Sequence, residues 1–81
     1  MEVRADGTVL RPERVLQHRV VPATRGRAAT YEYLIKWEGY SAARNSWLPV
    51  ANLVLSRWLL EDHWRANDTP PPPGALPPVV D

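Results

Sequence analysis

The chain has no cysteine and no long apolar run. Without cysteine, the 81 residues can form no disulfide, no thiolate nucleophile and no cysteine-ligated zinc site, a composition that suits a reducing cytosol or nucleus. No stretch approaches the roughly 20 apolar residues that a membrane span needs. The first residues, with Glu2, Arg4 and Asp6, also lack the apolar region of a signal peptide. We therefore expect a soluble protein without a membrane partner.

Patterns for catalysis and metal binding are also missing. His18 and His63 are the only histidines, and neither has a serine nearby in a recognisable nucleophile motif. The sequence has no glycine-rich phosphate loop and no metal-ligand spacing. Glu61 and Asp62 are adjacent acids, but adjacent residues on a helix point in different directions. The sequence predicts a binding module, not an enzyme, and no cofactor.

The most informative stretch runs from Tyr31 to Trp47 and holds two of the four tryptophans and all three tyrosines. Tyr33, Ile35 and Trp37 alternate with Leu34 and Lys36. This run is rich in aromatic and β-branched residues, which predicts a strand with side chains on both faces. Residues 38–41 form a predicted turn, because Gly39 is free to adopt a positive φ. A second short strand from residue 45 is expected to end at Pro49, and Trp47 is expected in the core.

Flanking patterns complete the predicted fold. Residues 14–21 alternate in a way typical of a first strand, and Ala23 to Ala29 reads as its hairpin loop. Ser56 is a suitable N-cap for a helix that runs to about Asn67. Its apolar stripes would comprise Leu55, Leu59, His63, Leu60 and Trp64. We predict an α+β fold, a three-stranded antiparallel curved sheet with a C-terminal α-helix packed across one end.

Several separated motifs resemble one known family. Leu34 to Tyr40 (LIKWEGY), Asn45 to Pro49 (NSWLP) and Asn52-Leu53 stand in the order and spacing of the chromodomain core. Upstream, residues 13–20 resemble the first strand of that family, and residues 59–64 resemble its closing helix. The resemblance implies an SH3-like small barrel that acts as a chromatin-associated binding module in the nucleus, with a histone tail or another chromatin protein as its partner.

Domain boundaries follow from this alignment. Residues 1–10 are expected to be a flexible arm able to clamp a peptide as a strand, and residues 11–66 the chromodomain. Residues 67–81 are expected to form an extended, disordered tail, because proline cannot donate the hydrogen bonds of a helix or central strand. The tail is interpreted as a linker, or as a ligand for a proline-recognising domain through Pro70 and Pro73.

The resemblance also implies a cage for methylated lysine. Quaternary ammonium groups are attracted to aromatic faces by about 0.5–2 kcal/mol each. Trp37 and Tyr40 occupy two of the aromatic wall positions of the family, whereas the third position falls on Leu10. Leucine supplies an apolar wall but no quadrupole, so the cage is incomplete.

Further positions concern the bound peptide. The residues expected to hydrogen-bond or pair with its backbone are Asn52, Val9 and Arg11. Chromodomains that clamp a histone tail usually carry acids at three positions that here are Arg44, Leu48 and Val54. A cationic tail would lose attraction there and meet repulsion from Arg44.

Three functions remain open at this stage. The divergent cage resembles the chromodomains of integrases from gypsy-like long-terminal-repeat retrotransposons, where the module would direct integration toward chromatin. The alternative is weak binding of DNA or RNA phosphates along one sheet edge by the arginines, Arg11, Arg14, Arg19, Arg25, Arg27 and Arg44. We expect a monomer, with dimerisation through an exposed Trp58 or Trp64 as the third alternative.

Overall fold

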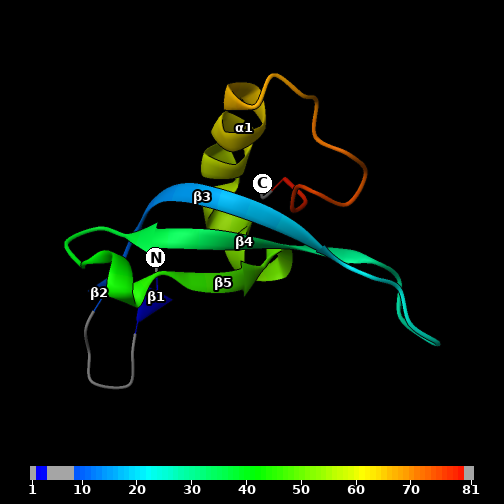
Figure 1. Cartoon of the computed structure of the whole chain (residues 1–81), viewed down its shortest axis with the longest axis horizontal. Coiled ribbons are helices and arrows are strands. Elements are labelled where there is room, and N and C mark those ends of the chain that lie inside the picture. Colours follow the sequence, from blue (N-terminus) through cyan, green and yellow to red (C-terminus); the bar gives the residue numbers. More distant parts are fainter. Residues whose placement is uncertain (1, 4–8, 80–81) are drawn as a thin grey trace.

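A curved three-stranded antiparallel sheet forms the centre of the molecule (Figure 1). The structure is a computed structural model in which residues 2–3 and 9–79 are described. The sheet has the order β3-β4-β5, with β3 at Pro12–Val21, β4 at Thr30–Trp37 and β5 at Ser46–Pro49. Within the described part of the chain, no helix is long and apolar enough to cross a membrane.

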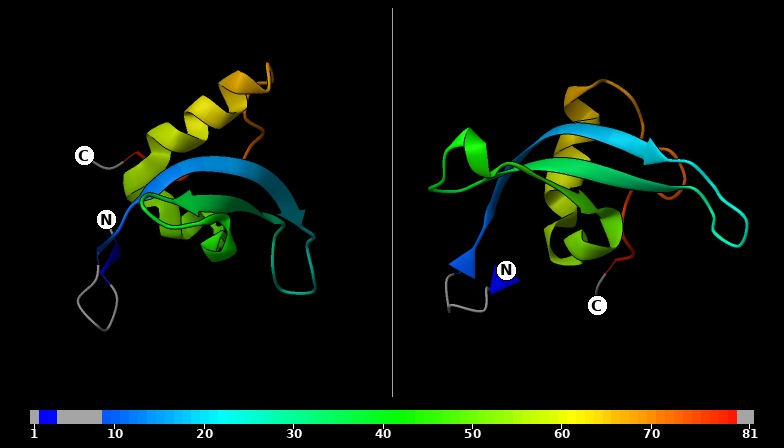
Figure 2. Two further views of the ribbon diagram at one scale, coloured as in Figure 1. Left: turned by 60° about the vertical axis from the view of Figure 1, so that its left-hand side comes forward. Right: turned by 60° about the horizontal axis from the view of Figure 1, so that its bottom comes forward.

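Beta-bulges explain the curvature of the sheet. The pairing of β3 with β4 changes register between Pro12 and Arg14 and again between Val15 and Gln17. An extra residue on one strand bends it and increases its twist. The ten-residue β3 therefore arches over the helix side of the sheet, as both views of Figure 2 show.

The arm is partly structured. β1 (Glu2–Val3) pairs antiparallel with β2 (Val9–Leu10) as a separate small sheet. The backbone N–H of Glu38 donates to the carbonyl of Arg11 over 2.8 Å, which ties the end of the arm to the turn after β4. Residues 1 and 4–8 of the predicted arm lie outside the described residues.

The helix α1 (Arg57–Ala66) covers one face of the sheet (Figure 2). It follows a 3₁₀ segment, Val50–Ser56, and Ser56 stands at its N-cap position as predicted. A three-stranded antiparallel sheet with a C-terminal helix is therefore confirmed.

The buried cluster joins alternate residues of β4 to the helix. Tyr33 and Ile35 are fully buried and Trp37 is 5% exposed, because alternate side chains of a strand point to one face. Leu60 and Trp64 of α1 pack against them, and the indole N–H of Trp64 donates to the Tyr33 hydroxyl over 2.9 Å. Burial raises the pKa of Tyr33, although the hydrogen bond from Trp64 acts in the opposite direction.

Two predicted core positions are wrong. Trp47 pairs across the sheet with Leu34, and cross-strand partners share a face, so it lies on the face opposite to Tyr33. Its half-buried ring lies 4.1 Å from the Arg19 guanidinium instead of contacting the helix. Leu55 is 68% exposed because it belongs to the 3₁₀ segment before α1 and not to the apolar stripe of the helix.

The prediction of a disordered tail is also corrected for part of the segment. Ala75 and Pro77 are buried, and Ala75 belongs to the same cluster as Tyr33 and Trp64. Figure 1 shows the chain leaving the end of α1, arching outward and returning to the sheet. The physical reason is that proline lacks an N–H but keeps its carbonyl, so such a segment can still accept hydrogen bonds from the domain.

Candidate ligand pocket

A small pocket opens at the C-terminal end of β4. Its volume is about 140 Å³, and its lining residues are Leu10, Trp37, Tyr40, Arg44, Ser46 and Leu48. These residues come from β2, from the end of β4, from the connection after it and from β5. The structure therefore brings together Leu10, Trp37 and Tyr40, the three positions that sequence reasoning assigned to a cage.

A tight turn sets the spacing of the two aromatic residues. The backbone N–H of Tyr40 donates to the carbonyl of Trp37 over 3.1 Å, and Gly39 has φ +80° as expected. A β-turn with a positive φ at its third residue favours glycine. The glycine thus allows the chain to reverse directly after the strand, which leaves both rings on one pocket.

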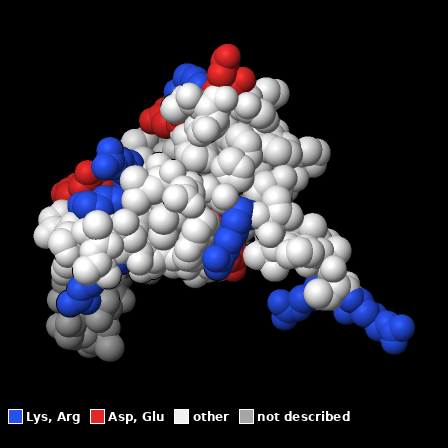
Figure 3. Space-filling model, viewed as in Figure 1, with Lys and Arg blue, Asp and Glu red and all other residues white. Residues whose placement is uncertain are grey.

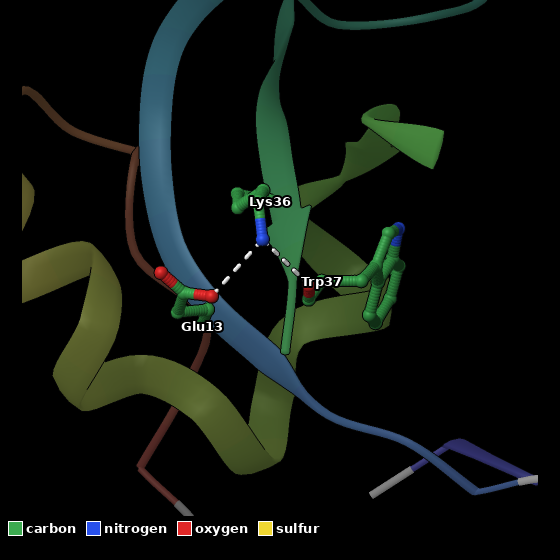
Figure 4. A network of polar contacts seen from close by, with 3 residues as sticks. All are labelled: Glu13, Lys36 and Trp37. Carbon is green, nitrogen blue, oxygen red and sulfur yellow. Dashed lines mark hydrogen bonds and ion pairs between the residues drawn. The ribbon is translucent and has the colours of Figure 1, made fainter. Parts of the chain in front are cut away.

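Polar contacts fix the end of β4 that carries Trp37. Lys36 donates to the carbonyl of Trp37 over 3.0 Å and pairs with the Glu13 carboxylate of β3 over 3.1 Å (Figure 4). In the same view, the Trp37 indole projects away from the Lys36 ammonium group. The ion pair lies on the side away from the pocket and holds the two strands together where the pocket begins.

Sequence reasoning did not single out Asn45 or Ser46. The indole N–H of Trp37 donates to the Ser46 hydroxyl over 3.4 Å, and that hydroxyl donates to the Arg44 carbonyl over 2.9 Å. The buried Asn45 Oδ1 has no hydrogen-bond partner among the described residues. The Asn-Ser-Trp motif was the available signal, but it was read as a strand start and as part of the chromodomain resemblance, with no pocket role for Asn45 or Ser46.

Arg44 already places a cation at the pocket. It ends the short 3₁₀ helix Ala42–Arg44, and its guanidinium carbon lies 5.7 Å from the centre of the Tyr40 ring. That distance is within the range of a cation–π contact. A cationic ligand would have to displace this guanidinium from the ring or share the ring with it.

The expected peptide-binding positions belong to different segments of the chain. Asn52 is exposed in the 3₁₀ segment before α1, and Arg11 is exposed directly after β2. Val9 is paired through its backbone with Val3. Neither Asn52 nor Arg11 lines the 140 Å³ pocket itself.

The arginines expected to contact nucleic acid do not form one continuous edge. Arg25 and Arg27 lie in the hairpin loop between β3 and β4, where Figure 3 shows basic side chains projecting from the body. Arg19 is paired with Glu32 over 2.7 Å, and Arg14 lies near the start of β3. Arg44 belongs to the connection after β4, at the opposite end of that strand from the hairpin loop.

The two tryptophans expected to anchor a dimer also differ. Trp58 is 57% exposed, whereas Trp64 is only 4% exposed. Trp64 is therefore not an exposed anchor, since its side chain is part of the core.

The molecule thus combines a three-stranded sheet, a C-terminal helix and a small pocket at one end of β4. Residues 10–65 match the Chromo (CHRromatin Organisation MOdifier) domain, and the chain belongs to this family. This membership makes it a chromatin-associated binding module and confirms the predicted resemblance at the level of the family.

Comparison with curated proteins gives the same family. Chromobox protein homolog 2 of Mus musculus and that of Homo sapiens are each 40% identical to the chain over 48 residues. The match covers 59% of this chain but only 9% of the length of either relative. These matches support the chromodomain family and not its integrase-like subtype. No solved structure shows a significant match.

Proposed function

We propose that the pocket of Leu10, Trp37 and Tyr40 receives the methylated ammonium group of a lysine in a histone tail. The observation that carries this proposal is that Leu10, which is distant in sequence from Trp37 and Tyr40, lines one pocket of about 140 Å³ with them. A cavity of about 150 Å³ holds one benzene molecule, which is similar in size to a trimethylammonium group. The pocket is thus suited to a side-chain head and too small for a drug-sized ligand.

The chemistry of the lining supports the same ligand. Trp37 and Tyr40 each offer a π-face worth about 0.5–2 kcal/mol to a desolvated cation. Leu10 is half-buried and offers apolar contact to the methyl groups. With two aromatic walls and a competing Arg44, we expect weaker binding than three aromatic walls would give.

The peptide backbone would lie beside the arm. An extended peptide can add to an exposed strand edge, and β2 is a short strand next to the pocket. β1 already pairs with β2, so the peptide would add at the free side of Val9 and Arg11 or displace β1. Asn52 is proposed to hydrogen-bond the peptide backbone.

Titration with histone-tail peptides tests the proposal. Unmethylated and trimethylated forms are compared by NMR, with the Trp37 indole and Tyr40 signals as readouts. Trp37→Ala is a poor variant because Trp37 is 5% exposed and part of the core. Tyr40→Ala should abolish the methyl-dependent shifts and leave the fold intact.

Tyr31→Ala is the matched control. Tyr31 is also half-buried, but its ring lies 6.3 Å from that of Trp64, at the other end of β4 from the pocket. Equal shifts with methylated and unmethylated peptides, or full methyl-dependent binding by Tyr40→Ala, would reject the cage.

A nuclear location and a role in directing a retroelement integrase to chromatin are more specific proposals. The nuclear location rests on the similarity to chromobox proteins and on membership of the chromodomain family. The integrase role rests on the divergent cage at Leu10 and on the arginine-rich first hairpin. The reading frame of the parent gene tests the second proposal. An integrase catalytic domain before this segment would support it, and a parent without one would reject it.

Nucleic-acid binding is the second candidate function. The exposed Arg25 and Arg27 project from the body on the hairpin loop, a geometry suited to phosphate contacts (Figure 3). Affinity for duplex DNA should fall steeply between low and moderate salt and be lost in the double variant Arg25→Glu, Arg27→Glu. Unchanged affinity in this variant would exclude the hairpin as the contact.

A further inference from the structure

The proline-rich tail reaches the core through a local turn that its own sequence encodes. The backbone N–H of Ala75 donates to the carbonyl of Pro72 over 3.0 Å, and Gly74 has φ +83°. Proline at the second position and glycine at the third are the preferences of a type II turn, and here they are Pro73 and Gly74. This turn reverses the chain and presents residues 75–77 to the domain.

Side chains of the domain hold this stretch by two of its backbone carbonyls. The Tyr33 hydroxyl donates to the carbonyl of Ala75, and the Arg57 guanidinium donates to the carbonyl of Pro77. Both donors are themselves fixed, because Trp64 donates to the Tyr33 oxygen over 2.9 Å and Glu61 pairs with Arg57 over 2.9 Å. A polyproline-like chain has no internal hydrogen bonds, so its carbonyls are free to accept hydrogen bonds from the domain.

Close packing accompanies the hydrogen bonds. Ala75 is 0% exposed and Pro77 is among the fully buried side chains, whereas Pro78 is exposed. Leu76 is half-buried against the core cluster. The position of Ala75 therefore accepts only a small side chain, which gives the contact sequence selectivity.

The segment between the helix and the turn is held much less closely. Pro70, Pro71 and Pro73 are exposed, and a hollow of about 560 Å³ lies between the tail and the end of α1. Figure 1 shows this connection arching away from the helix before the chain returns. Residues 75–77 thus resemble a ligand on a tether more than a continuation of the packed chain.

We propose that Tyr33, Arg57 and Trp64 form a second binding groove, for proline-rich peptides with a small residue two positions before a proline, which the chain's own residues 75–77 fill in cis. Aromatic side chains with hydrogen bonds to peptide carbonyls are a general means of binding polyproline segments. The groove is distinct from the pocket of Leu10, Trp37 and Tyr40. Tyr33 of the groove and Trp37 of the pocket are four residues, about 13 Å, apart along β4. A tethered segment competes at an effective concentration on the order of millimolar, so an external peptide binds well only when the tail is released.

A cleavable tether tests this proposal. A protease recognition sequence is inserted between the exposed residues Thr69 and Pro70, so that cleavage leaves residues 70–81 bound without a covalent link. After the fragment is removed by dialysis, a fluorescent peptide with the sequence of residues 70–79 is titrated. The cleaved chain should bind it saturably, and the uncut chain should bind it at least tenfold more weakly.

Matched variants identify the groove. Arg57→Gln should lower the affinity for the peptide roughly tenfold, because a hydrogen bond from a charged group is lost. Arg65→Gln is the control, since Arg65 is on the same helix and pairs with Asp62 over 2.6 Å. A peptide with Ala75→Leu should not bind because the buried alanine site has no space for it.

Each outcome decides the proposal. A cleaved chain that stays folded and does not bind the peptide overturns it, as does one that unfolds without the fragment and does not refold when the peptide is added. A cleaved chain that loses its fold and regains it with the peptide supports the groove. Equal affinity of the Arg57→Gln and Arg65→Gln variants would place the binding elsewhere.

Discussion

Arg44 is the charged residue in the lining of the pocket formed by Leu10, Trp37 and Tyr40. Its guanidinium lies 5.7 Å from the Tyr40 ring centre and lines the pocket with Leu10 and Trp37. In effect, the side chain occupies one π-face that a methylated lysine would use. This residue distinguishes the pocket from one that simply attracts cations.

Replacement of Arg44 by an acid should therefore strengthen binding. Arg44→Glu removes the competing cation–π contact and adds a favourable charge, so affinity for a trimethylated histone peptide should rise about 3- to 10-fold. Isothermal titration calorimetry measures the change. Arg25→Glu is the control, with the same charge change on the distant hairpin loop. Unchanged or weaker binding by Arg44→Glu would show that Arg44 does not compete for the pocket.

Two histidines, His63 of α1 and His18 of β3, are in direct contact where the helix meets the sheet. His63 Nε2 lies 2.8 Å from His18 Nδ1, and the side-chain amide of Asn67 lies 3.4 Å from His63 Nδ1. This arrangement fits a neutral His63 that donates from Nε2. Burial, together with the neighbouring His18, lowers the pKa of His63 below its usual 6.5.

The lowered pKa predicts acid sensitivity. A histidine whose pKa is depressed by folding contributes stability above the unfolded-state value of about 6.5, and that stability is lost as pH falls through the folded-state pKa. The thermal midpoint should therefore fall more between pH 7.5 and 5 in the native chain than in His63→Gln. Parallel pH profiles for the two proteins, measured by circular dichroism, would contradict this assignment.

At the scale of elements, the turn at Pro72 to Ala75 is what connects the tail to the core. Gly74 and Gly26 have the same φ of +83°, and a Cβ built on either meets no atom within 4 Å. Substitution by alanine thus adds only backbone strain at both sites. The two glycines differ in what their turns position. The turn at Gly74 brings the tail to the core, whereas Gly26 lies in an exposed hairpin loop.

Gly74→Ala should loosen the tail, whereas Gly26→Ala should not. The left-handed conformation costs a residue with a Cβ about 1–2 kcal/mol, and an exposed loop can relax to avoid that cost. Urea unfolding should show a loss of about 1–2 kcal/mol for Gly74→Ala and a smaller loss for Gly26→Ala. Proteolysis within residues 70–79 should accelerate only in Gly74→Ala. Equal stabilities and equal proteolysis would mean that the turn does not hold the tail.

At the scale of the whole molecule, the stability of an 81-residue domain is about 4–12 kcal/mol. The tryptophans contribute to it unequally. Trp64 is buried in the core and hydrogen-bonded to Tyr33, Trp47 is half-buried under Arg19, and Trp58 is 57% exposed. The degree of burial thus predicts how much each of these three tryptophans contributes to stability.

The expected order of destabilisation is Trp64→Ala, then Trp47→Ala, then Trp58→Ala. Trp64→Ala should cost about 3–5 kcal/mol, as large buried aromatics do, and leaves the Tyr33 hydroxyl without its donor. Trp58→Ala should change stability by at most about 0.5 kcal/mol. Chemical denaturation of the three variants checks the order. A Trp47→Ala variant less stable than Trp64→Ala would restore Trp47 as the core residue that its sequence pattern predicts.

Local patterns in the sequence were enough to predict the strands, the helix and the turn at Gly39. Alternation from Tyr33 to Trp37 is a property of the strand itself, and the Ser56 cap is a property of one helix end. The pairing of Leu10 with Trp37 and Tyr40 came from the resemblance to a family, because no local pattern links residue 10 to residue 37. The lining of the pocket agrees with that pairing, while the ligand remains a proposal.

Features that depend on distant contacts were decided only by the tertiary structure. Trp47 lies on the outer face because its cross-strand partner is Leu34, a matter of register that the Asn-Ser-Trp motif does not encode. The tail docks because Tyr33 and Arg57, 42 and 20 residues away from their acceptors, present donors where its carbonyls arrive. Sequence determined which segments extend, coil or turn, since those preferences are local. The fold decided which of them touch, because contact depends on the packing of the whole chain.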